Sequence, residues 1–564
     1  MLTKLIQKHA LLLGILIIAF ALRAIGLGYG LPHEFIGDEF IQVAIALTML
    51  NEHALTPNFP DIFYHQPLSA YISTFGIGGY LAWQLLVGGF ESINVLRDFY
   101  VIHANELLII PRFISALLGT LALIFIYLAG RDLFSKKVGL IATWFGATEL
   151  LLVYINHSGR VWGYMIFFIA FALWASTKLL KTDTTKNYTR SVIATLLAAA
   201  NLLPGIFTFI PSLVARFRWK NKKIWYASLG IVAGLIIIIA INPRGLGALL
   251  FRFQSLSGSG LVEAVAGRAV EYEVQPTPIQ NRIFDTFITL INFAPLYMLL
   301  AIIGGVLLYK KEKKAFIFLI SFPIAYYLFI GPFFGFGWVA RTLVPLMLYG
   351  IIFAAYAAET MMRKYNLKTT AAVAAVMLFS TPSLISSILL DVKLVKDDTR
   401  EQAINWIYEN LPEHTKILYY SETPESLNQD KSVLEVIAVV APGTLSKKQK
   451  MLLTMNEDVL PKPNFFIWDI RKIPKQDLPE NFFKENEFQY YIRILWDTED
   501  RGKFDEIIEN QFSKKKLIKS FSPFKEGGVD EKNFGNVHNM IYPWRALLNA
   551  EQFGPIVEIY EITF

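Results

Sequence analysis

Cysteine is absent from this chain of 564 residues, and charged residues make up only 18% of it. The absence of cysteine excludes a disulfide framework, a thiol nucleophile and thiolate metal sites. The scarcity of charge, together with 54% hydrophobic and 14% aromatic residues, is unlike an ordinary soluble protein of this length. The composition therefore indicates a polytopic membrane protein.

A small-residue cleavage site is also missing after the first apolar run, so the signal-peptide-like start MLTKLIQKHA is predicted to lead into a retained helix. Further runs long enough to span a bilayer follow. The run at 191–215 is interrupted by Asn201, Pro204 and Gly205 and is predicted to form two short helices. The prediction is therefore about eleven transmembrane helices. They lie at 11–29, 113–133, 138–155, 163–180, 191–215, 224–242, 287–309, 315–333, 343–360 and 369–390.

The basic residues, which give a formal net charge of +7, cluster in short segments between the apolar runs. That pattern is typical of cytoplasmic loops and argues against nucleic acid as a partner. It predicts a multi-pass plasma-membrane protein with a cytoplasmic N-terminus, a first extracytoplasmic loop at 30–111 and an extracytoplasmic C-terminal region. A further apolar run, Pro67–Phe90, breaks this arrangement if it crosses, so it is predicted to lie in the outer interface.

Residues 391–564 have a charged, mixed composition that differs from the preceding part of the chain. A helix is predicted over DDTREQAINWIYENLP, and strands at 417–420, 465–468, 490–496 and GPIVEIYEITF, with a polar helix near 501–510. This alternation predicts a small α/β domain. The segment has no Gly-rich phosphate loop, no metal-spaced histidine cluster and no catalytic triad motif. We expect it to recognise an acceptor or to stabilise the catalytic face.

Two adjacent carboxylates, Asp38 and Glu39, follow the first apolar run in the stretch YGLPHEFIGDEF. Acidic side chains at the rim of a membrane helix are costly to keep and are often functional. The predicted topology places this pair outside the membrane. Asp38 and Glu39 are therefore the first candidates for catalytic residues.

Four arginines are predicted to lie at the same outer rim: Arg23, Arg112, Arg160 and Arg341. Arginine is the preferred residue where a phosphate is held by two hydrogen bonds, and an anion within a membrane implies a lipid phosphate. Structural alternatives stay open, since Arg23 could form a plain ion pair with a carboxylate and Arg112 could be a snorkelling interface anchor.

The first loop contains a second polar group in DIFYHQPLSAY, where Asp61 and His65 precede the interfacial run. His65 could contact an acceptor or a phosphate. A single histidine beside a turn is equally well explained as a hydrogen-bonded loop residue.

The order of these motifs resembles the GT-C glycosyltransferases, the group that contains the protein O-mannosyltransferases and the lipid A aminoarabinose transferase. The resemblance runs from Arg23 through GDEF and DIFYHQPL to PRFISALLGTLALIFIYLAGRDLFSKKVGLIA, then to ARTLVPLMLYG, DTREQAINWIYENLP and the terminal GPIVEIYEI. It covers most of the chain. Each motif is weakly specific alone, and their order along one topology carries the resemblance.

The resemblance implies a mainly α fold: a GT-C-type transmembrane catalytic domain over 1–390 and an extracytoplasmic α/β domain over 391–564. It implies an inverting transferase that moves a sugar from a polyprenyl-phosphate-linked donor to a protein, lipid or glycan acceptor. Asp38 matches the family's general base, Glu39 a helper, and Arg23 and Arg112 the arginines that bind the donor phosphate, with Arg160 and Arg341 as additions.

His65 matches the histidine of the family's His-Pro-Pro-Leu motif, but Gln66 stands where the family often has proline, which leaves the role of that turn in doubt. Some members use a divalent ion, and Asp38, Glu39 and Asp61 are the possible ligands here. A metal requirement is not predicted.

Two other functions compete with a transferase. A transporter or flippase of lipid-linked sugars also needs an outer anion site, but it is expected to show helices broken at matching positions of two repeats, and the only interruption is the one near Pro204. A noncatalytic membrane scaffold leaves the carboxylate pair and the arginines without a role.

Overall fold

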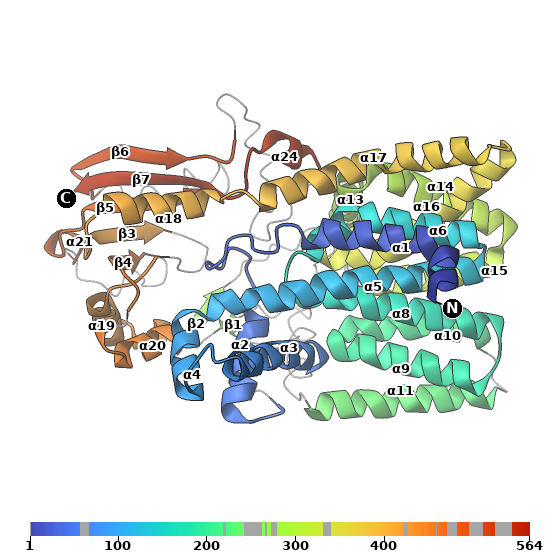
Figure 1. The fold of residues 1–564 in the computed structure, drawn as a ribbon, viewed down its shortest axis with the longest axis horizontal. Coiled ribbons are helices and arrows are strands. Elements are labelled where there is room, and N and C mark those ends of the chain that lie inside the picture. The colour runs from blue at the N-terminus through green and yellow to red at the C-terminus, as the bar shows by residue number, and fades with distance from the viewer. Residues whose placement is uncertain are drawn as a thin grey trace. The chain divides into compact units, whose positions relative to one another are not determined.

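The structure is a computed structural model. It describes residues 2–56, 67–217, 221–241, 262–265, 268–271, 279–330, 340–420, 427–445, 447–457, 460–470, 482–495, 511–524 and 544–564. The chain forms two compact units (Figure 1). The first consists of Met1–Leu27, Ile41–Gly79 and Ile109–Asp391, and the second of Gly28–Phe40, Tyr80–Leu108 and Val392–Phe564. The second unit thus includes the short segment that carries Asp38 and Glu39.

The described residues of the first unit are helical apart from one small β-hairpin. Helices α5, α8, α9 and α11 run roughly parallel in Figure 1, and α5 packs on α8, α8 on α9, and α9 on α11. Its helices are α1 (Leu2–Ala24), α2 (Phe40–Glu52), α3 (Pro67–Leu86), α5 (Ile109–Leu133), α6 (Lys136–Thr148), α7 (Leu150–Ile155), α8 (Val161–Lys181), α9 (Thr185–Asn201), η2 (Leu203–Thr208), α10 (Phe209–Arg216), α11 (Lys222–Ile241), α13 (Ile279–Phe293), α14 (Pro295–Lys311), α15 (Lys313–Leu328), α16 (Ala340–Lys364) and α17 (Thr369–Leu394). The first residue of α2, the end of α3 from Tyr80 and the end of α17 from Val392 belong to the second unit. The hairpin pairs β1 (Val262–Val265) with β2 (Arg268–Glu271).

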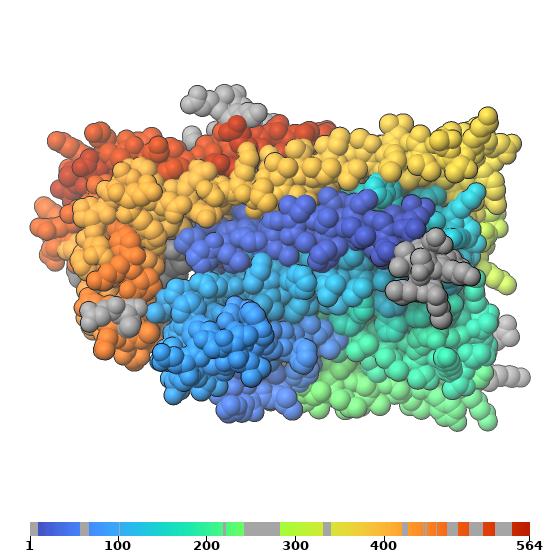
Figure 2. Space-filling model, viewed as in Figure 1, coloured from blue at the N-terminus to red at the C-terminus, as the bar shows by residue number. Residues whose placement is uncertain are grey.

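Among the described residues, five helices are long and apolar enough to cross a membrane, or six if α13 and α14 form one bent span. Two of these helices, α11 and α17, are mostly unburied, and the shorter apolar helix α1 exposes Leu11 and Ile17, as a lipid environment allows. Figure 2 shows α1 lying beside α5 on an open face of the first unit. The chain is therefore a multi-pass membrane protein by the length and composition of its helices.

Several predicted spans differ from the helices that form. The run 138–155 is divided at Glu149, whose carboxylate accepts the backbone N–H groups of Leu151 and Leu152 and so starts α7 as a new helix. The run 287–309 is divided before Pro295, where the chain bends by 116° between α13 and α14. The predicted split of 191–215 is confirmed, since α9 ends at Asn201 and α10 begins at Phe209. Helix α3 is not among the helices that are long and apolar enough to cross a membrane.

The second unit is built on a five-stranded mixed sheet in the order β4-β3-β5-β7-β6. Strands β3 (Lys416–Tyr420), β4 (Phe466–Asp469) and β5 (Tyr490–Leu495) are parallel, whereas β7 (Ile556–Thr563) pairs antiparallel with both β5 and β6 (Lys514–Phe521). Its helices are α4 (Ile93–Ile102), η1 (Ala104–Leu108), α18 (Thr399–Asn410), α19 (Lys431–Val440), η4 (Pro442–Thr444), α20 (Lys447–Thr454), α21 (Phe482–Glu485) and α24 (Trp544–Asn549).

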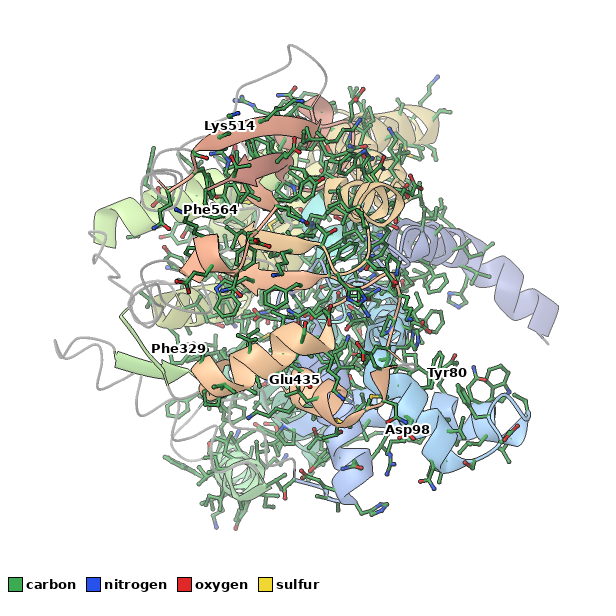
Figure 3. The ribbon with its side chains drawn as sticks, turned by 90° about the vertical axis from the view of Figure 1, so that its left-hand side faces the viewer. Tyr80, Asp98, Phe329, Glu435, Lys514 and Phe564 are labelled. Atoms are coloured by element: carbon green, nitrogen blue, oxygen red, sulfur yellow. The ribbon has the colours of Figure 1, made fainter. Side chains whose placement is uncertain are left out.

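The core of the second unit lies between the sheet and the helices beside β4. Trp468 of β4 and Tyr491 of β5 are almost fully buried and pack with Val433 and Leu434 of α19. In Figure 3, Glu435 marks α19, Lys514 the start of β6, and Phe564 the C-terminal end of the chain. Strand β5 is buried over nearly its whole length, as expected for a strand covered on both faces.

A histidine to carboxylate pair at the start of α19 makes the stability of the second unit depend on pH. His414 Nδ1 lies 2.5 Å from Asp430 Oδ2, and this hydrogen bond raises the pKa of His414. Burial acts to raise the pKa of Asp430, but the hydrogen bonds from His414 and the backbone N–H of Ser432 outweigh it and lower that pKa.

We therefore expect His414→Gln to lower the melting temperature most near pH 5.5. A raised histidine pKa stabilises the fold below the unfolded value of about 6.5, and a lowered aspartate pKa stabilises it above about 3.9. The effect should be below about 1 kcal/mol, because the side chain of His414 is 60% exposed. Thermal melts of detergent-solubilised protein between pH 5 and 8 measure it. A difference from wild type that grows toward pH 8 would contradict this account.

Candidate functional site

The two predicted catalytic carboxylates have different environments within the second unit. Asp38 is exposed and has a φ of +64°, whereas Glu39 is completely buried. A non-glycine residue in the left-handed region costs of order 1–2 kcal/mol and persists only when its surroundings hold it there. The turn therefore presents the Asp38 carboxylate at its surface and keeps the Glu39 carboxylate inside.

Short-range hydrogen bonds shape this turn. The backbone N–H of Glu39 donates to the Ile36 carbonyl at 3.3 Å, and the N–H of Phe40, the first residue of α2, donates to Glu34 Oε1 at 3.3 Å. Glu34 thus supplies an acceptor for one of the N–H groups that a helix leaves unsatisfied at its start. Upstream, Gly30 has a φ of +66°, and a Cβ there would lie 2.6 Å from the Phe35 ring.

Arg23 lies in the first unit, near the C-terminal end of α1, and is 1% exposed. Its Nε donates to Asn156 Oδ1 at 3.2 Å, Nη1 to the carbonyls of Ala19 at 2.9 Å and Ala147 at 3.1 Å, and Nη2 to the carbonyl of Gly146 at 2.8 Å. Gly146 and Ala147 belong to the last turn of α6, whose carbonyls favour a cation. Arg23 therefore joins α1 to the end of α6.

Because of these contacts, Arg23→Lys should lower the melting temperature by several degrees. A lysine keeps the charge but cannot reproduce the planar fork that reaches Asn156 and two carbonyls of α6. Buried carbonyls left without a donor cost about 1–3 kcal/mol each. Thermal melts of the detergent-solubilised protein measure the loss. A melting temperature equal to that of wild type would exclude the joining role.

Arg112, on α5, is 1% exposed, and its Nη1 donates to the Leu27 carbonyl at 2.7 Å. His157 Nε2 lies 3.0 Å from the Ile25 carbonyl and 3.3 Å from Asp391 Oδ1. Both side chains thus bind carbonyls just beyond α1, where a helix end leaves its acceptors unsatisfied. They fix the backbone of the first unit up to the point where the Gly28–Phe40 segment begins.

Asn156 brings three of the predicted arginine positions to one buried region of the first unit. Its Oδ1 accepts from Arg23, and its Nδ2 donates to the Ser115 carbonyl at 2.9 Å, one turn along α5 from Arg112. Arg160, which is 4% exposed, follows Asn156 in the same loop and precedes α8. Arg341 is half-buried at the start of α16. Asp61 and His65 lie outside the described residues.

Sequence reasoning missed a polar group between α2, α3 and α8. Ser73 Oγ donates to Gln42 Oε1 at 3.2 Å and lies 3.1 Å from the Tyr164 hydroxyl, which in turn donates to the Pro111 carbonyl at 3.3 Å. Gln42 is completely buried, and its Nε2 has no partner among the described residues. A single glutamine within an apolar helix forms no recognisable sequence motif. The only indication of a role for Gln42 was its position four residues after Asp38.

The carboxylates of the described residues do not form a ligand set for a metal ion. No three histidine, aspartate or glutamate side chains of the described part of the chain converge. Asp38 and Glu39 are adjacent, but one is exposed and the other buried. A hard divalent cation needs several oxygen ligands directed at one point, and the third predicted ligand, Asp61, lies outside the described residues.

No protein-family model and no curated protein matches the chain. Its structure is similar to that of ArnT from Cupriavidus metallidurans in the apo state, with a TM-score of 0.46, 10% identity and 98% of each chain covered. It is also similar to the Archaeoglobus fulgidus oligosaccharyltransferase, with a TM-score of 0.45, 13% identity, and coverage of 85% of this chain and 68% of that one.

A third similar structure is the S. cerevisiae protein O-mannosyltransferase Pmt1-Pmt2 complex bound to the sugar donor, with a TM-score of 0.31, 20% identity, and coverage of 48% of this chain and 37% of that one. ArnT has also been solved with undecaprenyl phosphate. These similar structures are GT-C glycosyltransferases, the group that the sequence motifs resemble. At TM-scores below 0.5, the roles of individual residues rest on the contacts within this chain.

Proposed function

We propose that this protein is an integral-membrane inverting glycosyltransferase that moves a sugar from a polyprenyl-phosphate-linked donor to an extracytoplasmic acceptor. The observation that carries the proposal is the Asp38 turn. It is a left-handed, exposed aspartate beside a buried glutamate, on a segment that directly follows the apolar helix α1. A strained residue of this kind is a frequent feature of active sites.

In the proposed reaction, the Asp38 carboxylate takes the proton of an acceptor hydroxyl. The acceptor oxygen then attacks the anomeric carbon of the donor sugar from the face opposite the phosphate, and a new C–O bond forms as the bond to the phosphate oxygen breaks. The polyprenyl phosphate leaves with the electron pair of that bond. The configuration at the anomeric carbon is inverted, and Glu39 supports Asp38 from inside the turn.

The leaving phosphate needs positive charge that is already in place. We assign this role first to Arg112, with Arg160 and Arg341 as further cations. Arg23 gives four hydrogen bonds to protein acceptors, so in this proposal it mainly holds the framework and offers one remaining N–H. The unpaired Nε2 of Gln42 is a further donor for a phosphate or sugar oxygen, since an unpaired buried amide is costly unless it is used.

The membrane orientation in this proposal follows from the charge pattern of the sequence. The N-terminus is cytoplasmic, and the Asp38 turn and residues 391–564 are extracytoplasmic. The donor carries a hexose or a pentose, and the acceptor is a protein, a lipid or a glycan.

The test is transfer of labelled sugar by the purified full-length protein in liposomes. A panel of polyprenyl phosphates, each carrying one labelled hexose or pentose, is offered together with a membrane extract as the source of acceptor. Transfer from one donor, with release of the free polyprenyl phosphate, supports the proposal. Movement of intact labelled donor across the bilayer without transfer would instead favour a flippase.

A further inference from the structure

A buried ion pair in the second unit contacts the segment that carries Asp38. Asp398 is completely buried and Arg400 is 3% exposed. Arg400 Nε donates to Asp398 Oδ1 at 2.7 Å and Arg400 Nη2 to Asp398 Oδ2 at 2.8 Å, a two-bond pairing. The third nitrogen, Nη1, donates to the Phe35 carbonyl at 3.3 Å, and the guanidinium lies 4.0 Å from the centre of the Phe35 ring. Arg400 therefore holds Phe35 by both its backbone and its side chain.

The same carboxylate binds the segment at a second point. The hydroxyl of Tyr29 donates to Asp398 Oδ2, and the ring of Tyr29 packs edge-on against those of Phe35 and Phe553. Tyr29 and Phe35 lie on the two sides of Gly30, and Phe35 is three residues before Asp38. The pair thus binds the segment twice on its way to the Asp38 turn.

The C-terminal end of the chain closes over this pair. The backbone N–H of Thr399 donates to the Phe553 carbonyl at 3.0 Å, and Thr399 Oγ1 donates to the Pro555 carbonyl at 2.6 Å. Gly554 has a φ of +113°, and a Cβ there would lie 2.5 Å from Asp398 Oδ1. The sequence motifs DTR and GPIVEIYEI, which are more than 150 residues apart, meet at this point.

A cap for α18 explains only part of this arrangement. Asp398 accepts the backbone N–H of Arg400 at 2.8 Å, and that bond alone is enough for its role as the N-cap of α18. It requires neither the guanidinium of Arg400 nor the hydroxyl of Tyr29. A buried ion pair is also a poor source of stability compared with apolar packing. The guanidinium of Arg400 and the hydroxyl of Tyr29 are instead explained by the order that their contacts impose on the Gly28–Phe40 segment.

We propose that Arg400, oriented by Asp398, and Tyr29 are positioning residues that hold the Asp38 turn in its left-handed conformation. The C-terminal domain would then set the geometry of the catalytic base as well as any contact with the acceptor. This inference rests on the proposed function for its catalytic consequence. Its structural consequence, order in residues 30–40, can be measured without any substrate.

The test compares two tyrosine variants of the full-length protein. Tyr29→Phe removes the hydroxyl that binds Asp398. The control, Tyr408→Phe, removes a half-buried phenol of the same unit, whose hydroxyl accepts the backbone N–H of Asn428 at 3.3 Å. Hydrogen exchange followed by mass spectrometry should show exchange about tenfold faster in peptides covering 30–40 for Tyr29→Phe, and no change there for Tyr408→Phe. Arg400→Met should give a larger effect than Tyr29→Phe, and Arg400→Lys a partial rescue.

With the active donor, Tyr29→Phe should lower kcat while leaving the KM for donor within about twofold. A merely structural role predicts instead equal effects of the two tyrosine variants, in proportion to their melting temperatures. Unchanged exchange of 30–40 in Tyr29→Phe would overturn the positioning role. Faster exchange of residues 30–40 in Tyr29→Phe without a fall in kcat would show that the order of this segment does not affect catalysis. If wild type transfers no sugar at all, the proposed function fails, and the exchange result still decides whether these residues order the turn.

Discussion

Asp38→Asn should reduce sugar transfer about 10³-fold, the contribution expected of a general base that is removed without other change. The amide has nearly the same shape as the carboxylate but cannot take the proton of the acceptor hydroxyl. Asparagine is also among the residues that tolerate the left-handed region best, so the φ of +64° at this position does not penalise the substitution. The fold and the melting temperature should therefore be retained.

Initial rates of transfer from the labelled polyprenyl-phosphate donor, with wild type and variant at equal concentration, measure this effect. Glu39→Gln is the matched control, because it neutralises the neighbouring carboxyl with the same small change of shape. Glu39 is completely buried, so Glu39→Gln should act only by altering the conformation of the Asp38 turn. It should therefore lower turnover by a smaller factor than Asp38→Asn. Full turnover by Asp38→Asn would show that Asp38 is not the general base. A larger loss of turnover in Glu39→Gln than in Asp38→Asn would indicate that Glu39 is the base and Asp38 the helper.

The sequence was a good guide where a local pattern decides the structure. The strands at 417–420, 465–468 and 490–496 were predicted within about one residue of β3, β4 and β5, because short apolar runs between turn residues are strand signals. Strand β6 was missed. Its sequence, KKKLIKSF, is rich in lysine and mostly exposed at the edge of the sheet. Lysines on an edge strand oppose pairing with other chains, but they also replace the apolar residues by which a strand is recognised in sequence. The polar helix predicted near 501–510 lies outside the described residues.

Hydropathy was a weaker guide to where helices break. An apolar run shows that a segment is buried or in lipid, but the bend between α13 and α14 and the new helix start at Glu149 depend on single residues within such runs. A buried glutamate that caps a helix and a proline at a helix start leave the mean hydropathy almost unchanged. The predicted number of transmembrane helices therefore exceeded the number of described helices that are long and apolar enough to cross a membrane.

For the site, the sequence indicated the residue types but not their separate environments. Asp38 and Glu39 are adjacent in sequence, and only their different exposure in the structure shows that one carboxylate faces out and the other in. Similarly, Arg23 and Arg112 both read as membrane arginines. Arg23 binds carbonyls of α6, whereas Arg112 binds a carbonyl just beyond α1. No periodicity in the sequence predicts either contact. The contact of Arg400 with Phe35 joins residues 365 positions apart and was likewise beyond any local pattern.

This difference between the two arginines makes Arg112→Lys the most informative change to the proposed phosphate site. Lysine can keep one hydrogen bond to the Leu27 carbonyl, which Arg112 Nη1 makes at 2.7 Å, and it keeps the positive charge. It loses the planar fork with which a guanidinium binds two phosphate oxygens. The loss of one charge-assisted hydrogen bond is worth about 1.5–3 kcal/mol. We therefore expect the KM for the polyprenyl-phosphate donor to rise by at least about tenfold.

Arg23→Lys makes the same chemical change at an equally buried arginine and should give the opposite result. Arg23 uses its fork on Asn156 and on carbonyls of Ala19, Gly146 and Ala147, so its replacement should lower the melting temperature and leave the donor KM of the remaining folded protein almost unchanged. Donor titrations and thermal melts of the two variants separate ligand binding from framework. A lowered melting temperature with unchanged donor KM in Arg112→Lys would place Arg112 in the framework too, and the phosphate would then have to be held by Arg160, Arg341 and Gln42.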